Sequence, residues 1–170
     1  MSNVRRQMLH TNALYQLGRF VVMFQRIEGA LTDLLVLLAR ADDEAVRILV
    51  NDLAFVQRVK TTTALFNRFV DLQLVPDTAR KAAFAALATE IIKLAERRNE
   101  LVHSDYSAWT NIHGASGLLR SSSRLRKGER EQREEEMLAQ AFEPDIQRLA
   151  KIAQQMEEFR LYAISCIYPE

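Results

Sequence analysis

The feature that most constrains the fold of this chain is the helical spacing of its apolar residues. Between about Thr11 and Arg40, apolar side chains recur at intervals of three and four, as they do on one face of an α-helix. This stretch predicts a helix of roughly thirty residues, about 45 Å long at the usual rise per residue. Two inward-facing sets fit it, namely Leu17, Val21, Phe24, Leu31, Leu35 and Leu38, or Phe20, Phe24, Ile27, Leu31 and Leu34.

Further helices follow, each with recognisable start or stop signals. The acidic residues 42–44 would cap a short helix that runs through Val50, and Pro76-Asp77 separates helices over about 53–73 and 77–104. A last helix starts near Pro144, because proline suits the first helical position. Their expected core residues are Val56, Val59, Phe66, Phe69, Phe84, Leu87, Ile91, Leu94, Leu101, Leu149, Ile152, Met156, Phe159 and Ala163. The chain is therefore expected to be an all-α bundle of about five helices.

The stretch 107–141 departs from the helical pattern and is predicted to be a loop insertion before the last helix. Three glycines and the run Ser121-Ser122-Ser123 punctuate it, and a basic stretch that includes Arg120, Arg124 and Arg126 precedes the acidic run 134–136. We expect an irregular loop or a small, loose β-hairpin, with a helical turn around 134–139. Its basic residues would form either an ordinary solvated surface or a flap that grips RNA.

Length, charge and cysteine content narrow the class of protein. With 170 residues, 48% of them hydrophobic, the chain is expected to form a single domain over 1–170. The formal net charge is +1, so no overall field attracts nucleic acid or anionic lipid. Cys166 is the only cysteine, and Phe20–Ala39 is interrupted by charged residues. We therefore expect a cytoplasmic protein with no membrane span.

The segment from Arg98 to His103 carries the clearest chemical signal. Asn99 and His103 are four residues apart and thus share a helical face, while Arg98 lies about 100° around the axis from Asn99. An imidazole can transfer a proton near neutral pH, and a guanidinium can hold phosphate oxygens. RNA brings its own nucleophile, the 2′-hydroxyl, so its cleavage can proceed without a metal. One histidine per chain cannot easily act as both base and acid, which favours a two-fold dimer.

Two charges occupy positions where the helical stripes call for apolar residues. Four residues after Leu94 comes Arg98, and four after Phe24 comes Glu28. Since an unpaired charge at the rim of a core is costly, we predict that Glu28 pairs with Arg98, as support for the site or as a purely structural ion pair. Ser104 and Tyr106, just after the histidine, are further supporting candidates.

At Arg98, Asn99 and His103 the sequence resembles the HEPN superfamily, the higher eukaryotes and prokaryotes nucleotide-binding domains. Its ribonuclease members carry Arg, four to six residues and then His, often with Asn after the Arg. The order of long helices, a late motif, the aromatic Tyr106 and Trp109, a variable loop and a closing helix also looks similar. The likeness covers most of the chain as architecture and one short motif as residues.

This resemblance implies a metal-independent endoribonuclease that acts as a homodimer on an RNA substrate, without a cofactor. His103 would move the 2′-hydroxyl proton, Arg98 would steady the transition state, and Asn99 would orient the phosphate or His103. Bacterial members commonly serve toxin–antitoxin pairs or phage defence, with an antitoxin or nucleotidyltransferase partner. Toxins controlled by such partners usually have Tyr two positions after the His, where this chain has Asp105. The alternative is a non-catalytic HEPN-like module that dimerises and binds a nucleotide or protein.

Other kinds of functional site fit this sequence less well than the motif does. Glu100 and His103 form a Glu-x-x-His element like that of di-iron bundles, but neither His10 nor His113 has a glutamate three residues before it. His103 could also be a helix-end residue favoured by the helix dipole and by Asp105. Glycine-rich phosphate loops and serine-hydrolase elbows are absent. No metal site is therefore predicted.

Overall fold

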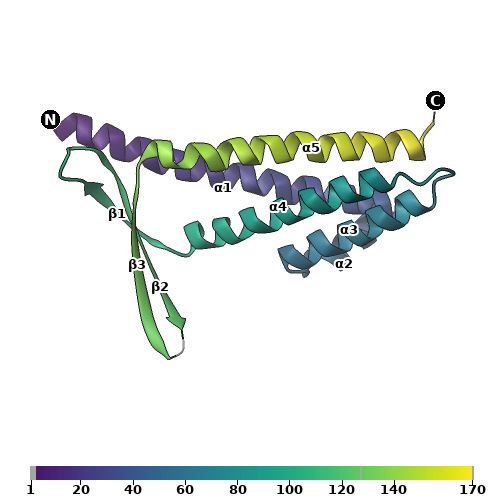
Figure 1. Cartoon of the computed structure of the whole chain (residues 1–170), viewed down its shortest axis with the longest axis horizontal. Coiled ribbons are helices and arrows are strands. Elements are labelled where there is room, and N and C mark those ends of the chain that lie inside the picture. Colours follow the sequence, from purple (N-terminus) through teal and green to yellow (C-terminus); the bar gives the residue numbers. More distant parts are fainter. Residues whose placement is uncertain (1–2, 127, 170) are drawn as a thin grey trace. The chain divides into compact units, whose positions relative to one another are not determined.

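The structure is a computed structural model that describes residues 3–126 and 128–169, with the side chains of 124–126 left out of the description. The described elements are α1 (Asn3–Ala39), α2 (Asp43–Asn51), α3 (Phe55–Asp71), α4 (Thr78–Val102), β1 (Asp105–Thr110), β2 (Ser116–Arg126), β3 (Glu129–Met137), a 3₁₀ turn (Ala139–Phe142) and α5 (Glu143–Ile167), as Figure 1 shows.

The chain divides into two compact units, and three helices contribute residues to both. Residues up to Met23 together with Glu96–Arg148 form one unit, which we call the sheet unit because it holds the three strands. Phe24–Ala95 and the residues from Leu149 on form the other, the helical unit. That residues 1–170 form a single domain stays a prediction.

The five predicted helices are confirmed among the described residues. As expected, Asp42 caps α2, where its side chain accepts a hydrogen bond from the Ala45 backbone N–H at 2.8 Å. Asp77 does the same for α4, accepting from the Arg80 backbone N–H at 2.9 Å. In α1 the second predicted set is fully buried, since Phe20, Phe24, Ile27, Leu31 and Leu34 are each at most 2% exposed.

The core of the helical unit is built from aromatic rings. Phe66 of α3 stacks on Phe84 of α4 with ring centroids 4.4 Å apart, and Phe159 of α5 meets both rings edge-on at 5.3 and 5.0 Å. Such edge-on and stacked pairs add to the free energy gained by burial. The periodic stripes of these three helices therefore did identify core residues.

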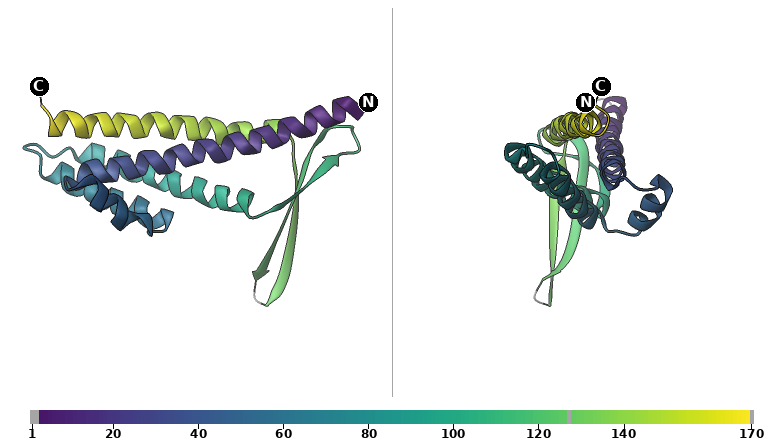
Figure 2. Two further views of the ribbon diagram at one scale, coloured as in Figure 1. Left: turned by 180° about the vertical axis from the view of Figure 1, so that it is seen from behind. Right: turned by 90° about the vertical axis from the view of Figure 1, so that its right-hand side faces the viewer.

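The all-α fold class was wrong, because 107–141 folds as most of a three-stranded antiparallel sheet of order β1-β2-β3. The basic residues of β2 stand opposite acidic residues of β3, in the pairs Arg120–Glu135, Arg124–Glu131 and Arg126–Glu129. Cross-strand pairs of opposite charge stabilise a sheet, and the Arg120–Glu135 pair joins the basic run to the acidic run within one hairpin. Past Ser121, which pairs with the first residue of β1, strands β2 and β3 continue as a two-stranded ribbon (Figures 1 and 2). The helical turn expected at 134–139 is instead a 3₁₀ turn over 139–142.

Two turns and one close contact fix the sheet. In the β1–β2 turn the Asn111 side chain accepts hydrogen bonds from the backbone of His113 and Ala115, and Gly114 adopts a φ of +80°. Gly128, in the β2–β3 turn, has a φ of +84°. In β2, a Cβ on Gly117 would lie 2.6 Å from the Met137 carbonyl oxygen, so only glycine fits there.

Among residues 3–126 and 128–169, none of the helices is both long enough and apolar enough to traverse a lipid bilayer.

Candidate functional site

Two residues of the predicted motif, Asn99 and His103, line a cavity in the sheet unit. This cavity has a volume of about 320 Å³. It is lined by Asn99 and Glu100 of α4, His103 just beyond α4, Arg120, Ser122 and Ser123 of β2, and Arg133 of β3. The His103 backbone N–H still donates to the Asn99 carbonyl oxygen at 3.1 Å, which keeps the two residues one helical turn apart on the same face. The expected sharing of a face by Asn99 and His103 is confirmed.

Arg98 has a different position from the one expected. Among the described residues it is not one of those that line the cavity, and its Nη1 atom donates to the Asn99 side-chain oxygen at 3.1 Å. Arg98 therefore orients the Asn99 amide, which itself lines the cavity. The geometry does not bring the Arg98 guanidinium and the His103 imidazole to one wall.

Arg120 supplies the buried guanidinium of this cavity. Only 8% of the residue is exposed, and its Nη2 atom forms an ion pair with Glu135 Oε2 at 2.9 Å. Its Nε and Nη1 atoms are also buried, and within the described part of the chain neither has a hydrogen-bond partner. Burial of a guanidinium whose N–H groups have no acceptor costs free energy, unless another group accepts those hydrogen bonds.

A second arginine, Arg97, connects this wall to the first turn of α5. Its Nε atom donates to Asp145 Oδ2 at 3.1 Å, and its Nη atoms lie 3.7 Å from Glu100 and from Glu135. Glu135 thus contacts both Arg97 and Arg120. Because these side chains are partly buried and Arg97 and Glu135 each contact more than one partner, the network holds α4, β3 and α5 together next to the cavity.

Tyr106 and Ser104 support the end of α4 rather than line the cavity. The Tyr106 hydroxyl donates to the Leu101 carbonyl oxygen at 2.8 Å, and the Ser104 hydroxyl donates to the Glu100 carbonyl oxygen. Both bonds serve carbonyls that the helix leaves unpaired at its end. Burial raises the pKa of the Tyr106 hydroxyl, against the opposing effect of the positive charges of Arg120 and Arg97.

Two predictions about charges stay open. Glu28 belongs to the helical unit and Arg98 to the sheet unit, so their pairing stays a prediction. The RNA-gripping flap was predicted from the basic run that includes Arg124 and Arg126. Their backbone lies in β2, but their side chains, like residue 127, lie outside the described residues.

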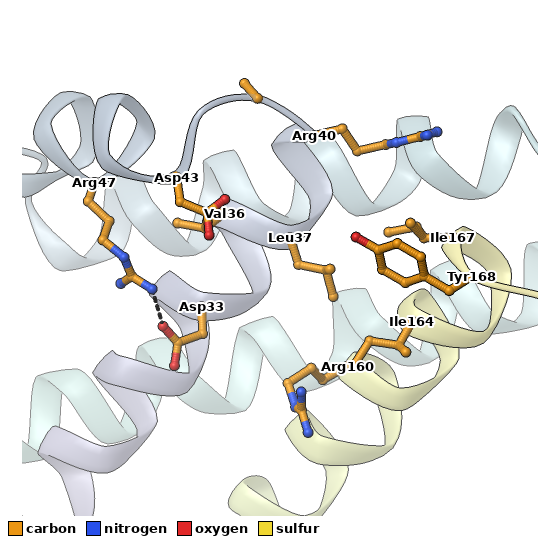
Figure 3. Close-up of a pocket in the computed structure, with 11 residues that line it drawn as sticks. Asp33, Val36, Leu37, Arg40, Asp43, Arg47, Arg160, Ile164, Ile167 and Tyr168 are labelled. Atoms are coloured by element: carbon orange, nitrogen blue, oxygen red, sulfur yellow. Dashed lines mark hydrogen bonds and ion pairs between the residues drawn. The ribbon is translucent and has the colours of Figure 1, made fainter.

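A larger cavity, of about 620 Å³, lies in the helical unit (Figure 3). Two of the arginines that line it are held in ion pairs. Arg47 pairs with Asp33 at 2.8 Å, as the dashed line in Figure 3 marks, and Arg160 pairs with Glu157 at 2.7 Å. No histidine lines it among the described residues. We therefore take the smaller cavity as the candidate site.

The Glu-x-x-His element has no metal-binding partners in the part of the chain that is described. Over residues 3–126 and 128–169, no three histidine, cysteine, aspartate or glutamate side chains gather in a way that could hold an ion.

Comparisons of this chain with protein-family models, with curated proteins and with solved structures gave no match. The function is therefore inferred from the residues of the cavity themselves.

Arg120, Arg133, Ser122 and Ser123 were not predicted as site residues. Arg120 had been noted only as one member of a basic run. A strand alternation over Leu118, Arg120 and Ser122 could have placed these three side chains on one face. That signal required 116–126 to be read as a strand.

Proposed function

We propose that this protein is a HEPN-type, metal-independent endoribonuclease, with His103 as the proton-transferring group. The observation that carries the proposal is the cavity in which an exposed imidazole, the Asn99 amide and two guanidinium groups lie together. These groups match what phosphodiester cleavage by a 2′-hydroxyl needs, namely a proton acceptor and positive charge near the phosphate.

The proposed reaction uses the substrate's own nucleophile. His103 removes the proton from the 2′-hydroxyl, whose oxygen then attacks the neighbouring phosphorus. The bond from phosphorus to the 5′-oxygen breaks, and a second acid protonates that oxygen. The products are a 2′,3′-cyclic phosphate and a 5′-hydroxyl. In this scheme Asn99 orients the phosphate or His103, and Arg98 acts as a positioning residue through its bond to Asn99.

A homodimer forms part of the proposal, because His103 of a second copy would supply the acid. An exposed stripe on α1 supports this association. Met8, Tyr15 and Val22 recur every seven residues, Val4 lies four before Met8, and all four are between 57% and 68% exposed. This spacing is typical of a helix that packs along a second helix. We place the enzyme in the cytoplasm, in toxin–antitoxin or phage-defence systems with an antitoxin or nucleotidyltransferase partner.

Incubation of the purified protein with mixed RNA in the presence of a chelator tests the activity. We expect internal cuts that leave cyclic phosphate ends, and a fall of at least about a hundredfold for His103→Ala. His113→Ala is the matched control, because His113 is exposed in a surface turn of the same unit. Intact RNA with a folded dimer would instead favour the non-catalytic binding module.

A further inference from the structure

Arg120 leaves part of its hydrogen-bonding capacity unused inside the candidate site. The side chain is about nine-tenths buried, and its ion pair with Glu135 uses Nη2 alone. Nε carries one N–H and Nη1 carries two, and neither atom has an acceptor in the described part of the chain. Buried polar groups in folded proteins almost always have a hydrogen-bond partner, so we expect an acceptor that binds these N–H groups.

We propose that the cavity binds a phosphate group, and that Arg120, rather than the motif residue Arg98, is the guanidinium that holds it. A phosphate offers several charged oxygen acceptors, and arginine is well suited to bind them. The inference deepens the proposed function, because it names the group that would contact the scissile phosphate. The phosphate site itself can be tested without any cleavage.

The other residues of the cavity wall fit an oxyanion. His103, Asn99, Ser122 and Ser123 can each donate a hydrogen bond, and Arg133 adds a second guanidinium. Among the described residues of the wall Glu100 is the one carboxylate, and it lies 3.7 Å from Arg97. The volume of about 320 Å³ is several times the roughly 30 Å³ that one water molecule occupies in the liquid.

Access to the two donors requires a small movement of the wall. Nε and Nη1 are nearly covered, but Ser123 and Arg133 are exposed, and 71% of the Arg133 side chain is in contact with solvent. Side chains that are so little packed can shift without disturbing the core. We expect such a shift to let a phosphate oxygen reach Nε and Nη1 of Arg120.

Titration of the whole protein with inorganic phosphate tests the proposal directly. Two-dimensional NMR of the arginine Nε–H signals follows Arg120, at constant ionic strength and with chloride as the comparison salt. We expect a saturable shift of the Arg120 signal with phosphate and none with chloride. An Arg120 signal that stays unmoved would overturn the proposal and would assign the donors to buried water instead.

Substitutions then separate the two arginines. Arg120→Lys keeps the charge beside Glu135 but replaces the planar fork of five N–H donors by three donors on one nitrogen, so phosphate affinity should fall at least about tenfold. Arg26→Lys, at an exposed position of α1, is the matched control and should leave the affinity unchanged. Loss of binding in Arg98→Lys with full binding in Arg120→Lys would refute the assignment. The wild-type titration stands even if Arg120→Lys fails to fold.

An oligonucleotide without 2′-hydroxyls, which cannot be cleaved by this route, distinguishes this inference from the proposed function. Binding of both phosphate and the oligonucleotide through Arg120 supports a nucleic-acid phosphate. Binding of free phosphate alone keeps the site but removes the support for a nuclease. Cleavage of RNA that is unaffected by Arg120→Lys keeps the nuclease and overturns the role of Arg120.

Discussion

Arg97 Nε donates a hydrogen bond to Asp145 Oδ2 across 3.1 Å, so the last turns of α4 are tied to the first turn of α5 within the sheet unit. The two side chains are only 23% and 15% exposed, which limits how far water can replace either partner. The backbone of the candidate site therefore depends on a pair that does not itself line the cavity.

Replacement of Arg97 by Ala is expected to lower the free energy of unfolding by about 1–3 kcal/mol, because Asp145 loses its closest cation. Urea denaturation measures this loss. Arg26→Ala, at an exposed position of α1, should change it by less than about 0.5 kcal/mol. Equal effects of the two substitutions would show that the Arg97–Asp145 pair contributes little.

Tyr106→Phe should destabilise the protein by about 1 kcal/mol, since the Leu101 carbonyl oxygen loses its hydrogen-bond donor. The same tyrosine should affect alkaline stability. Burial raises its pKa in the folded protein above the usual value of 10.0, so the folded state resists losing the proton. Stability therefore falls as pH rises beyond about 10, and the fall should be shallower in Tyr106→Phe. Identical alkaline profiles would contradict this.

The helices could be predicted from the sequence because the information that specifies them is local. Phe84, Ile91 and Leu94 follow a three- and four-residue spacing, and all three are buried. The strands carry no such signal. Ser121, Ser122 and Ser123 interrupt any apolar alternation in β2, and the strand is defined by its pairing with β3 across the turn at Gly128. In that pairing Arg120 of the basic run faces Glu135 of the acidic run. This match joins residues that are far apart in the sequence, so the sequence left an irregular loop and a small hairpin equally open.

Only those residues of the candidate site that lie on one helix could be predicted from the sequence. Asn99 and His103 share a face by spacing alone, whereas Arg120 reaches the same cavity through strand register. The charge stripe of α4 was equally ambiguous, because Arg97 lies three residues after Leu94 and Arg98 lies four after it. Which of the two arginines is paired depends on Asp145, on a different helix.

Gly117→Ala should destabilise the sheet unit by about 1–3 kcal/mol, because the new methyl group would lie 2.6 Å from a backbone oxygen of β3. Gly29→Ala is the matched control. Nothing lies within 4 Å of a Cβ at Gly29, and the position is inside α1, so alanine there should be neutral or stabilising. Chemical denaturation of both variants measures the difference, and an equally stable Gly117→Ala would argue against the β2–β3 register.

Asp77 is expected to make the helical unit less stable in acid. The Arg80 backbone N–H and then the Arg80 guanidinium hold the pKa of this carboxyl below its usual value of 3.8. The unfolded chain therefore binds a proton more readily, and the contribution of Asp77 is present above about pH 3.8 and lost as pH falls below it. Asp77→Asn should flatten that part of the stability profile. If the Asp77→Asn profile matched the wild-type profile between about pH 5 and about pH 2, the role of the cap would be contradicted.

The α1 stripe makes the proposed dimer testable through one exposed side chain. Tyr15→Glu places a charge at the middle of the stripe, where 65% of the native side chain is exposed, so the monomer should fold normally. Association should weaken at least about tenfold, or ~1.4 kcal/mol, because the new carboxylate would lose water in the interface. Sedimentation measures the dissociation constant, with Ala150→Glu on the exposed face of α5 as the control.

If His103 acts together with the second copy's His103, cleavage should fall in parallel with dimer content and recover at high protein concentration. A dimer that persists in Tyr15→Glu would assign the stripe to another contact and would leave the composite site without support.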